Sequence, residues 1–233
     1  MARIVKQEEF EMHRNEILDA AQRLVYTKGY EQMSIQDILS EVQISKGAFY
    51  HYFDSKQTLL ESLIERLGKQ AEELLIPVVQ DDRLPAAKKL ERFFDVGARW
   101  KTNQKDFMLT LVHVWYADEN SLLRQKVQAD LIPRTSYLLT TITYQGIQEG
   151  VFHTPFPEKV GEIIFSLLQS FGDTLSKMIL QEDLNSETLR RLEILSASYQ
   201  DAVERILGAA SGTLHLFDIA LLQEWFPPSK VPV

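Results

Sequence analysis

Apolar residues recur every three or four positions along most of the chain, which is the spacing that places them on one face of an α-helix. No stretch alternates apolar and polar residues as a half-buried β-strand does, and the sequence shows no internal repeat. The pattern predicts an all-α protein of nine or ten helices. The expected spans are about 8–28, 34–42, 46–52, 56–75, 85–103, 105–117, 120–148 with an interruption or kink at Pro133, 158–180, 186–207 and 214–226.

Residues with particular backbone preferences mark the ends of these helices. Ser34 is a good N-cap, and Asp37 stands three residues later, where its carboxylate reaches back to the free amides of the first turn. Further caps are expected at Ser45, Ser55 and Ser186, and further stops at Gly29, Pro77 and Gly150. Residues 1–6 precede the first apolar stripe, so they are expected to form a short mobile arm.

The stretch from Ser34 to Lys56 predicts two short helices joined by a tight turn. In the second helix Phe49 and Phe53 stand four residues apart, where they form its inward anchors. Gly47 and Ala48 are small enough for the backbone to approach a partner closely. The remaining outward side chains are a cation and three hydrogen-bonding aromatics, followed by a second cation: Lys46, Tyr50, His51, Tyr52 and Lys56. Such a set suits phosphates and base edges, and the two-helix plan is that of a helix-turn-helix.

This stretch also resembles a known family. The matching pattern reads Gly29-Tyr30, then Ser34-Ile35-x-x-Ile38, then Ile44-Ser45-Lys46-Gly47-x-Phe49-Tyr50-x-Tyr52-Phe53-x-Ser55-Lys56-x-x-Leu59. In order and spacing it is similar to the DNA-binding signature of the TetR family of bacterial transcriptional regulators, over roughly residues 12–60. The resemblance implies a helix-turn-helix DNA-binding domain over residues 1–54 and a helical ligand-binding and dimerisation domain over residues 55–233.

The same resemblance assigns roles to the surface residues. The helix 46–52 would enter the major groove of a double-stranded, palindromic operator. Lys46 is expected to contact guanine acceptors, Ala48 a thymine methyl group, and Gly47 to allow close approach. The expected phosphate contacts are Ser34, Ser45, Tyr50, His51, Tyr52 and Lys56.

One position departs from the family's pattern. Family members commonly have Ala-Gly-Val in the turn where this chain has Val42-Gln43-Ile44. If Gln43 adopts a left-handed conformation there, the strain is about 1 kcal/mol, which the surrounding core can absorb.

The charge balance favours a second interpretation. The formal net charge is −8, and residues 1–60 hold seven Lys and Arg against nine Asp and Glu, a net of −2. A nucleic-acid-binding domain usually has a basic face. DNA binding therefore requires Lys28, Lys46, Lys56 and the end of the chain with Arg3 and Lys6 to gather on one surface, with the acids away from it. The alternative is a helical ligand-binding or interaction protein whose helix-turn-helix contacts another protein.

Two late helices, over 158–180 and 186–207, are apolar over more of their circumference than one buried stripe needs. Small residues are interspersed along both, including Gly161, Ser170, Gly172 and Ala197. A helix of this kind packs on two sides, against its own core and against a partner subunit. The resemblance implies a homodimer through these two helices, and a deeper monomer core is the alternative.

The middle of the chain is rich in aromatic residues. Most of them belong to the core, but mostly apolar cavities between helices are also common small-molecule sites. In the resembling family a ligand lies within the fifth to eighth helices. The candidates by position are Trp100, Phe107, Leu111, Trp115, Tyr137, Thr141, Phe165 and Gln169. A small-molecule effector that releases the protein from DNA would make it a repressor.

No catalytic motif is found, so the protein is not expected to be an enzyme. The sequence contains no Gly-x-Ser-x-Gly, no glycine-rich phosphate loop and no His-Glu-x-x-His, and its five histidines are scattered. It contains no cysteine, which excludes disulfides and thiolate metal sites. No cofactor, metal ion, signal peptide or membrane span is expected, and the absence of cysteine fits the cytoplasm.

Overall fold

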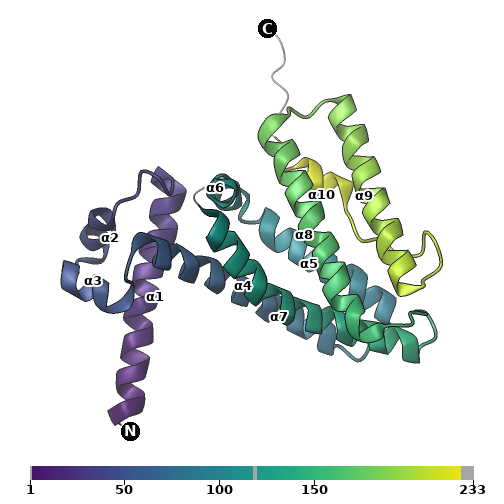
Figure 1. The fold of residues 1–233 in the computed structure, drawn as a ribbon, viewed down its shortest axis with the longest axis horizontal. Helices are drawn as coiled ribbons and strands as arrows, with labels where there is room; N and C mark the ends of the chain where they lie inside the picture. Colours follow the sequence, from purple (N-terminus) through teal and green to yellow (C-terminus); the bar gives the residue numbers. More distant parts are fainter. Residues whose placement is uncertain (1, 118–119, 227–233) are drawn as a thin grey trace. The chain divides into compact units, whose positions relative to one another are not determined.

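A computed structural model describes residues 2–117 and 120–226, and this part of the chain contains ten helices and no strand (Figure 1). The all-α prediction is confirmed. The helices are α1 Ala2–Lys28, α2 Ile35–Val42, α3 Lys46–Tyr52, α4 Lys56–Gln80, α5 Ala86–Thr102, α6 Lys105–Tyr116, α7 Ser121–Gln148, α8 Pro157–Gln181, α9 Ser186–Leu207 and α10 Ile219–Gln223.

The chain divides into two compact units. Unit 1 comprises Met1–Lys69 and Asp106–Val127, and unit 2 comprises Gln70–Lys105 and Gln128–Val233. Both α4 and α7 therefore begin in unit 1 and end in unit 2. The functional boundary between residues 54 and 55 stays a prediction.

The core of unit 1 is formed where α1 packs against the helix-turn-helix. Helical spacing along α1 buries Ile17, Leu18, Ala21, Leu24 and Val25, and the following helices contribute Ile38, Leu39, Phe49, Leu59, Leu60 and Leu63. The inward assignment of Phe49 and Phe53 is confirmed, since their exposed fractions are 0% and 3%. The aromatic anchors thus fix which face of α3 is left for solvent.

The start of α1 differs from the prediction. The helix begins at Ala2 rather than near Glu8, so residues 2–6 are helical and do not form an arm. No glycine or proline interrupts this stretch, so the backbone continues its helical hydrogen bonds beyond the apolar stripe that predicted the helix. The side chains of Arg3 and Lys6, which were considered for DNA contact, lie outside the described residues.

Unit 2 is built around one large apolar cluster. It joins the last turns of α4 to α5, α7, α8, α9 and the chain after α9, with Leu90, Leu139, Ile142, Phe152 and Ile164 almost completely buried. A smaller cluster around Phe171, Met178, Leu192, Leu222 and Phe226 joins α8, α9 and α10.

Two prolines lie inside helices. Pro77 was expected to end the fourth helix, yet α4 continues to Gln80. The reason is tertiary: Val78 and Val79 are buried in the large cluster of unit 2, and this burial outweighs the hydrogen bond that Pro77 removes. Pro133 likewise lies within a single helix, α7.

The predicted cap of α9 is displaced by one residue. Asn185, not Ser186, is the N-cap, because its side-chain oxygen accepts hydrogen bonds from the amides of Glu187 and Thr188, both at 2.9 Å. At the other end of the helix Gly208 takes the left-handed conformation, with φ 62°.

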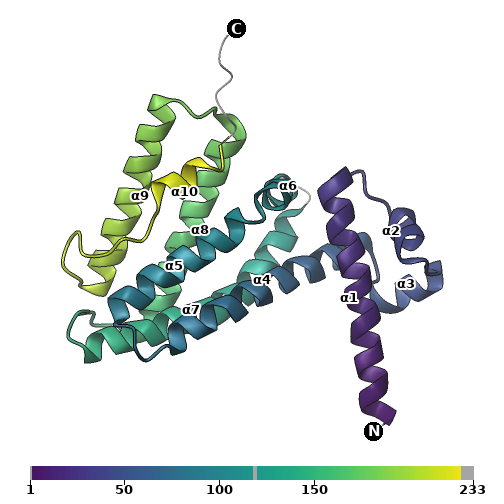
Figure 2. The ribbon, with the colours of Figure 1, turned by 180° about the vertical axis from the view of Figure 1, so that it is seen from behind.

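The segment after α9 is mostly not helical, contrary to the helix expected over 214–226. Only Ile219–Gln223 is helical, and the chain before it runs as an extended strap across unit 2 (Figure 2). Side chains of neighbouring helices accept the hydrogen bonds of its backbone. The carboxylate of buried Glu204 accepts from the amides of Gly212 at 2.8 Å and Leu214 at 2.9 Å. These bonds replace the intrahelical ones that the predicted helix would have made.

α8 and α9 lie side by side and antiparallel in both views (Figures 1 and 2). Among the described residues, α8 is the one helix long and apolar enough to cross a bilayer, by length and composition alone. The core helix of a globular protein passes the same test. Val160, Ile164 and Phe171 of α8 do pack inside unit 2.

Candidate nucleic-acid interface

The turn between α2 and α3 is set by local hydrogen bonds. The Ser34 hydroxyl accepts from the amide of Asp37 at 3.2 Å, and Asp37 Oδ2 accepts from the amide of Ser34 at 2.9 Å, so the predicted capping box is confirmed. Ser45 caps α3 by accepting from the amide of Ala48 at 3.1 Å. The predicted span of α3, Lys46–Tyr52, is also confirmed.

Between the two helices Gln43 is left-handed, with φ 58° and ψ 42°. It is the one non-glycine residue with positive φ in the described part of the chain. Its amide and that of Ile44 both donate to the carbonyl of Leu39, which ends α2 and turns the chain into α3. Gln43 thus adopts the left-handed conformation itself, at the position where family members commonly have glycine.

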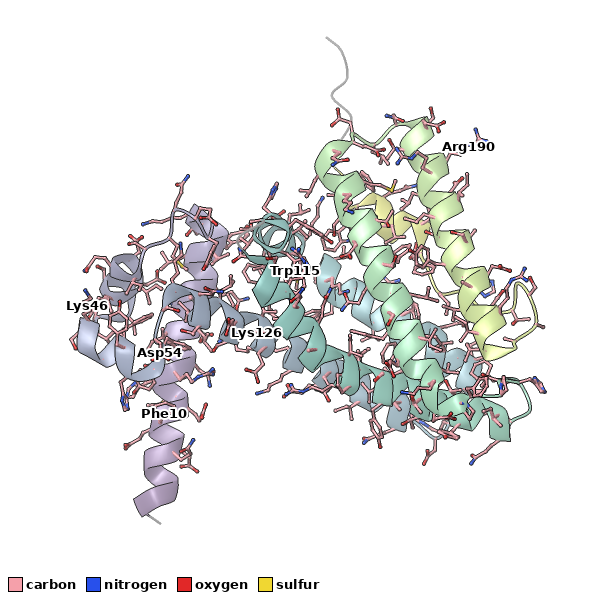
Figure 3. All side chains as sticks on the ribbon, in the orientation of Figure 1. Phe10, Lys46, Asp54, Trp115, Lys126 and Arg190 are labelled. Atoms are coloured by element: carbon pink, nitrogen blue, oxygen red, sulfur yellow. The ribbon has the colours of Figure 1, made fainter. Side chains whose placement is uncertain are left out.

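α3 leaves a polar face open to solvent. Phe49 is the buried residue of this fully described helix, whereas Lys46, Gly47, Tyr50 and His51 are exposed. Ala48 and Tyr52 are half-buried. Lys46 lies at the N-terminal end of α3, toward the outside of unit 1 (Figure 3). The structure therefore places the predicted base-contacting residues together on one accessible end of the helix.

Two basic residues of unit 1 are neutralised by acids of α2. Lys28 Nζ lies 2.7 Å from Asp37 Oδ1, and Arg23 Nε lies 2.7 Å from Glu41 Oε1. The hydrogen bond from Lys28, with those from the amide and hydroxyl of Ser34, holds the pKa of Asp37 well below its ordinary value of 3.8. Both pairs join α1 to α2, and because they are exposed each adds little to stability.

The two lysines expected at the interface have aromatic neighbours. Lys46 Nζ lies 6.0 Å from the ring centre of Tyr50, one turn further along α3. Lys56 Nζ lies 4.2 Å from the ring centre of Tyr30 and donates to the carbonyl of Glu31 at 3.3 Å. Both distances suit cation–π contact, which leaves the positive charge in place for an anion.

The hydroxyls of the two capping serines differ in what they leave available. Ser34 Oγ donates to Asp37 Oδ2 at 2.8 Å, so its proton is already used within the capping box. Ser45 Oγ accepts from Ala48, and a serine hydroxyl that accepts one bond can still donate its proton. Ser45 is therefore the better placed of the two for a phosphate contact.

Phe10 was missed by the sequence reasoning. Its ring lies 4.7 Å from that of Tyr52 and 5.6 Å from that of His51. Figure 3 labels Phe10 on α1. A signal was available: Phe10 stands four residues before Arg14 and seven before Ile17, so helical spacing places all three on one side of α1. Arg14 in turn lies 5.3 Å from the ring of Phe53. α1 thus supports the end of α3.

The predicted ligand residues are divided between the two units. In unit 1, Phe107 is buried and Leu111 and Trp115 are half-buried. In unit 2, Trp100, Phe165 and Gln169 are half-buried, and Phe165 packs against the large cluster. Tyr137 is 70% exposed, and the exposed Thr141 donates to its carbonyl at 3.0 Å. These assignments stay predictions.

Unit 2 has an open hollow of about 450 Å³ beside the place where α7 and α8 cross. The two helices approach closely there, because Gly161 has no side chain and lies against the carbonyl of Ser136. Of the predicted ligand residues, Tyr137 lines it, together with Ile132, Pro133, Ser136, Thr140, Glu158 and Glu162. Within the described residues no three His, Cys, Asp or Glu side chains gather in a way that could hold a metal ion.

Comparison with known proteins supports a regulatory family. The family described as "Bacterial regulatory proteins, tetR family" matches residues 17–63. An uncharacterized HTH-type transcriptional regulator of Lactococcus lactis is 39% identical over 79 residues, which are 34% of this chain and 40% of that protein. The regulator EthR of Mycolicibacterium smegmatis is 30% identical over 136 residues, 51% of this chain and 63% of that protein. The matches thus span less than two thirds of these relatives.

Solved structures show the same fold over more of the chain. A TetR transcription regulator from Haloarcula marismortui superposes with a TM-score of 0.62 at 20% identity, covering 85% of this chain and 97% of that one. The transcriptional regulator FadR from Bacillus subtilis, in complex with stearoyl-CoA, superposes with a TM-score of 0.58 at 20% identity, covering 86% of this chain and 98% of that one. The N-terminal helix-turn-helix followed by a larger helical domain is therefore the fold of this chain.

Proposed function

This chain belongs to the TetR family of bacterial regulatory proteins, and on that premise we propose that it is a transcriptional regulator that binds double-stranded DNA through α2 and α3. The observation that carries the proposal is the accessible N-terminal end of α3, where Lys46 and Gly47 are exposed and Ala48 is half-buried, while Phe49 anchors the helix in the core. A helix held in this way can enter a major groove without disturbing its own core.

The proposed contacts follow from the chemistry of each side chain. Lys46 donates to the acceptors of guanine, and the methyl group of Ala48 contacts a thymine methyl group. Ser45, Tyr50, His51, Tyr52 and Lys56, with Ser34 at the start of α2, hold phosphates. Since Lys28 and Arg23 are paired with acids, few cations remain for sequence-independent attraction, and binding to non-specific DNA is expected to be weak.

The regulator is proposed to act as a homodimer through α8 and α9. Ile163 and Ile194 of these helices are 44% and 58% exposed, although isoleucine is among the residue types most often buried. Near them Ser170 Oγ and Tyr199 Oη are 2.7 Å apart, and Ala197 and Ser198 are exposed and small. Two such helix pairs can pack closely as a four-helix bundle. Two recognition helices would then meet successive major grooves of a palindrome, about 34 Å apart.

A small-molecule effector is proposed to release the protein from DNA, so that the protein acts as a repressor. It is proposed to work in the cytoplasm and not to be an enzyme. Two solved structures with this fold are complexes with acyl-CoA molecules, stearoyl-CoA in one and lauroyl-CoA in the other. The effector residues proposed in unit 2 are Trp100, Tyr137, Thr141, Phe165 and Gln169. An effector that binds the DNA-free state more tightly by about 1–3 kcal/mol lowers operator affinity between severalfold and about a hundredfold.

The test is selection of a binding site from random DNA, followed by affinity measurements across a salt series. A palindromic site that binds one dimer, with affinity that falls steeply as salt rises, is the expected result. No binding even at low salt would contradict the proposal and would favour a role in binding protein, in keeping with the net charge of −2 over residues 1–60.

Lys46 provides the sharpest single variant. Lys46→Ala is expected to weaken operator binding by about 1–3 kcal/mol per recognition helix and to relax selectivity at one base pair in each half-site. Lys88→Ala, an exposed lysine on α5, is the matched control and is expected to bind normally. Gel-shift titration on the selected operator measures both, and unchanged affinity and selectivity of Lys46→Ala would remove this residue from the interface.

A further inference from the structure

Three aromatic rings join the first helix to the end of the recognition helix. Phe10 of α1 lies 4.7 Å from the ring of Tyr52, with a tilt of 38°, and 5.6 Å from the ring of His51, almost edge-on at 84°. The rings of His51 and Tyr52 are themselves 5.2 Å apart. All three separations fall in the range of favourable aromatic pairs. We call Phe10, His51 and Tyr52 the aromatic cluster.

The cluster lies where α3 most needs support. α3 has seven residues, and a helix of that length is not stable by itself. Phe49 holds its middle, but His51 and Tyr52 belong to its last turn, after which the chain becomes extended at Phe53 with φ −141°. Without a neighbour, these two side chains would sample several rotamers.

Two successive turns of α1 contact the end of α3. After Phe10, the next inward side chain is Arg14, which lies 5.3 Å from the ring of Phe53 and donates from Nη2 to the hydroxyl of Ser62 at 2.9 Å. Residues 51, 52 and 53 are therefore each in contact with α1. This support exists because α1 starts at Ala2 and carries Phe10 well inside the helix.

We propose that Phe10 is a positioning residue for DNA binding, which holds His51 and Tyr52 in the rotamers that meet the phosphate backbone. The phenylalanine ring has no hydrogen-bonding atom, so it makes no polar contact of its own with a phosphate. Rotamers restricted before binding lose less entropy when the complex forms. The inference rests on the proposed DNA binding and adds a residue of α1 to the determinants of affinity.

Phe10→Ala is expected to weaken operator binding by about three- to tenfold per recognition helix, and so by about 10- to 100-fold for a dimer. The slope of log affinity against log salt is expected to stay the same, because no cation is removed. Phe10→Tyr, which keeps the ring, should bind within about twofold of wild type. Met12→Ala, 52% exposed on the same helix, is the control and should bind as wild type.

A double-mutant cycle separates positioning from general stabilisation. If Phe10 acts through the aromatic cluster, Phe10→Ala should cost less than about twofold in a protein that already carries His51→Ala and Tyr52→Ala. Thermal unfolding of each variant checks folding, and Phe10→Leu replaces Phe10→Ala if the latter does not fold.

Additive losses, or an unchanged affinity of Phe10→Ala on an operator that wild type binds, would overturn the inference while leaving the proposed function intact. Tighter binding by Phe10→Ala would overturn it as well, since it would mean that the ring holds Tyr52 away from DNA. If wild-type protein selects no DNA, the proposed function fails, and this inference fails with it.

Discussion

Asp37 links the charge of unit 1 to the geometry of its helix-turn-helix. Its carboxylate closes the capping box with Ser34 and also pairs with Lys28 of α1, so one side chain both starts α2 and holds it against α1. The hydrogen bond from Lys28, followed by those from Ser34, depresses the pKa of Asp37. Stability gained from a depressed carboxyl pKa is present above the unfolded value and is lost as the pH falls through that value toward the folded one.

Asp37→Asn should therefore lower stability at pH 7, and its difference from wild type should shrink as the pH falls below about 4. The asparagine keeps the size of the side chain but has no charge for Lys28. Urea unfolding of both proteins at several pH values between 7 and 3 measures this difference. A constant difference across that range would show that the ionised carboxylate is not what stabilises the turn.

At Gln43, backbone strain is offset by the burial of nearby apolar side chains. A left-handed non-glycine residue costs about 1 kcal/mol, yet Gln43 keeps φ 58°. Ile38 and Leu39, five and four residues before it, are buried, with exposed fractions of 0% and 7%. Because burying an aliphatic side chain contributes about 1.5–3 kcal/mol, the turn can tolerate the strain. The left-handed conformation of Gln43 is thus imposed by the burial of its neighbours and not by the conformational preference of glutamine.

At the scale of elements, the strap after α9 is stabilised by contacts that lie far away in the sequence. Phe217 stacks on Phe171 of α8 at 4.4 Å and meets Phe94 of α5 edge-on at 5.8 Å. The backbone amide of Leu216 donates to Gln200 Oε1, and that of His215 donates to Glu91 Oε1. The strap therefore joins α5, α8 and α9 into one core.

Glu204 is the acceptor on which the strap most depends. Glu204→Ala would leave the amides of Gly212 and Leu214 without their partner. Because Leu214 is buried while Gly212 is exposed to water, the expected cost is about 1–3 kcal/mol. Glu204→Gln, which can still accept one bond, should lose less. Glu193→Ala, an exposed glutamate on the same helix, is the control. Chemical denaturation measures all three, and equal stabilities would show that the strap is held by its apolar side chains alone.

For the whole molecule, the proposed dimer governs DNA binding, because two weak half-site contacts act as one strong contact only when the recognition helices are joined. Ile194 is the most exposed large apolar side chain of α9. Ile194→Glu is expected to give monomers and to lower operator affinity by at least about 100-fold.

Val151→Glu is the matched control, since Val151 is 42% exposed but lies outside α8 and α9. Sedimentation equilibrium gives the oligomeric state and gel shift the affinity. Wild-type protein that is monomeric, or an Ile194→Glu variant that remains a dimer, would contradict an interface made by α8 and α9.

The sequence by itself determined the features that depend on neighbouring residues. The caps at Ser34 and Ser45, the span of α3, the inward anchors Phe49 and Phe53 and the family all follow from residues within a few positions of one another. A capping hydrogen bond or a helical stripe involves only one or two turns, so its sequence pattern specifies it nearly completely.

Only the tertiary structure decided features that depend on distant partners. Pro77 stays within α4 because of burial in the core of unit 2, and the strap is extended because Glu204, Gln200 and Glu91 accept its amides. Phe10 meets Tyr52 only after α1 has packed against the helix-turn-helix. Local propensity gives these residues no preference for such positions, since the free energy comes from contacts that exist only once the chain is folded.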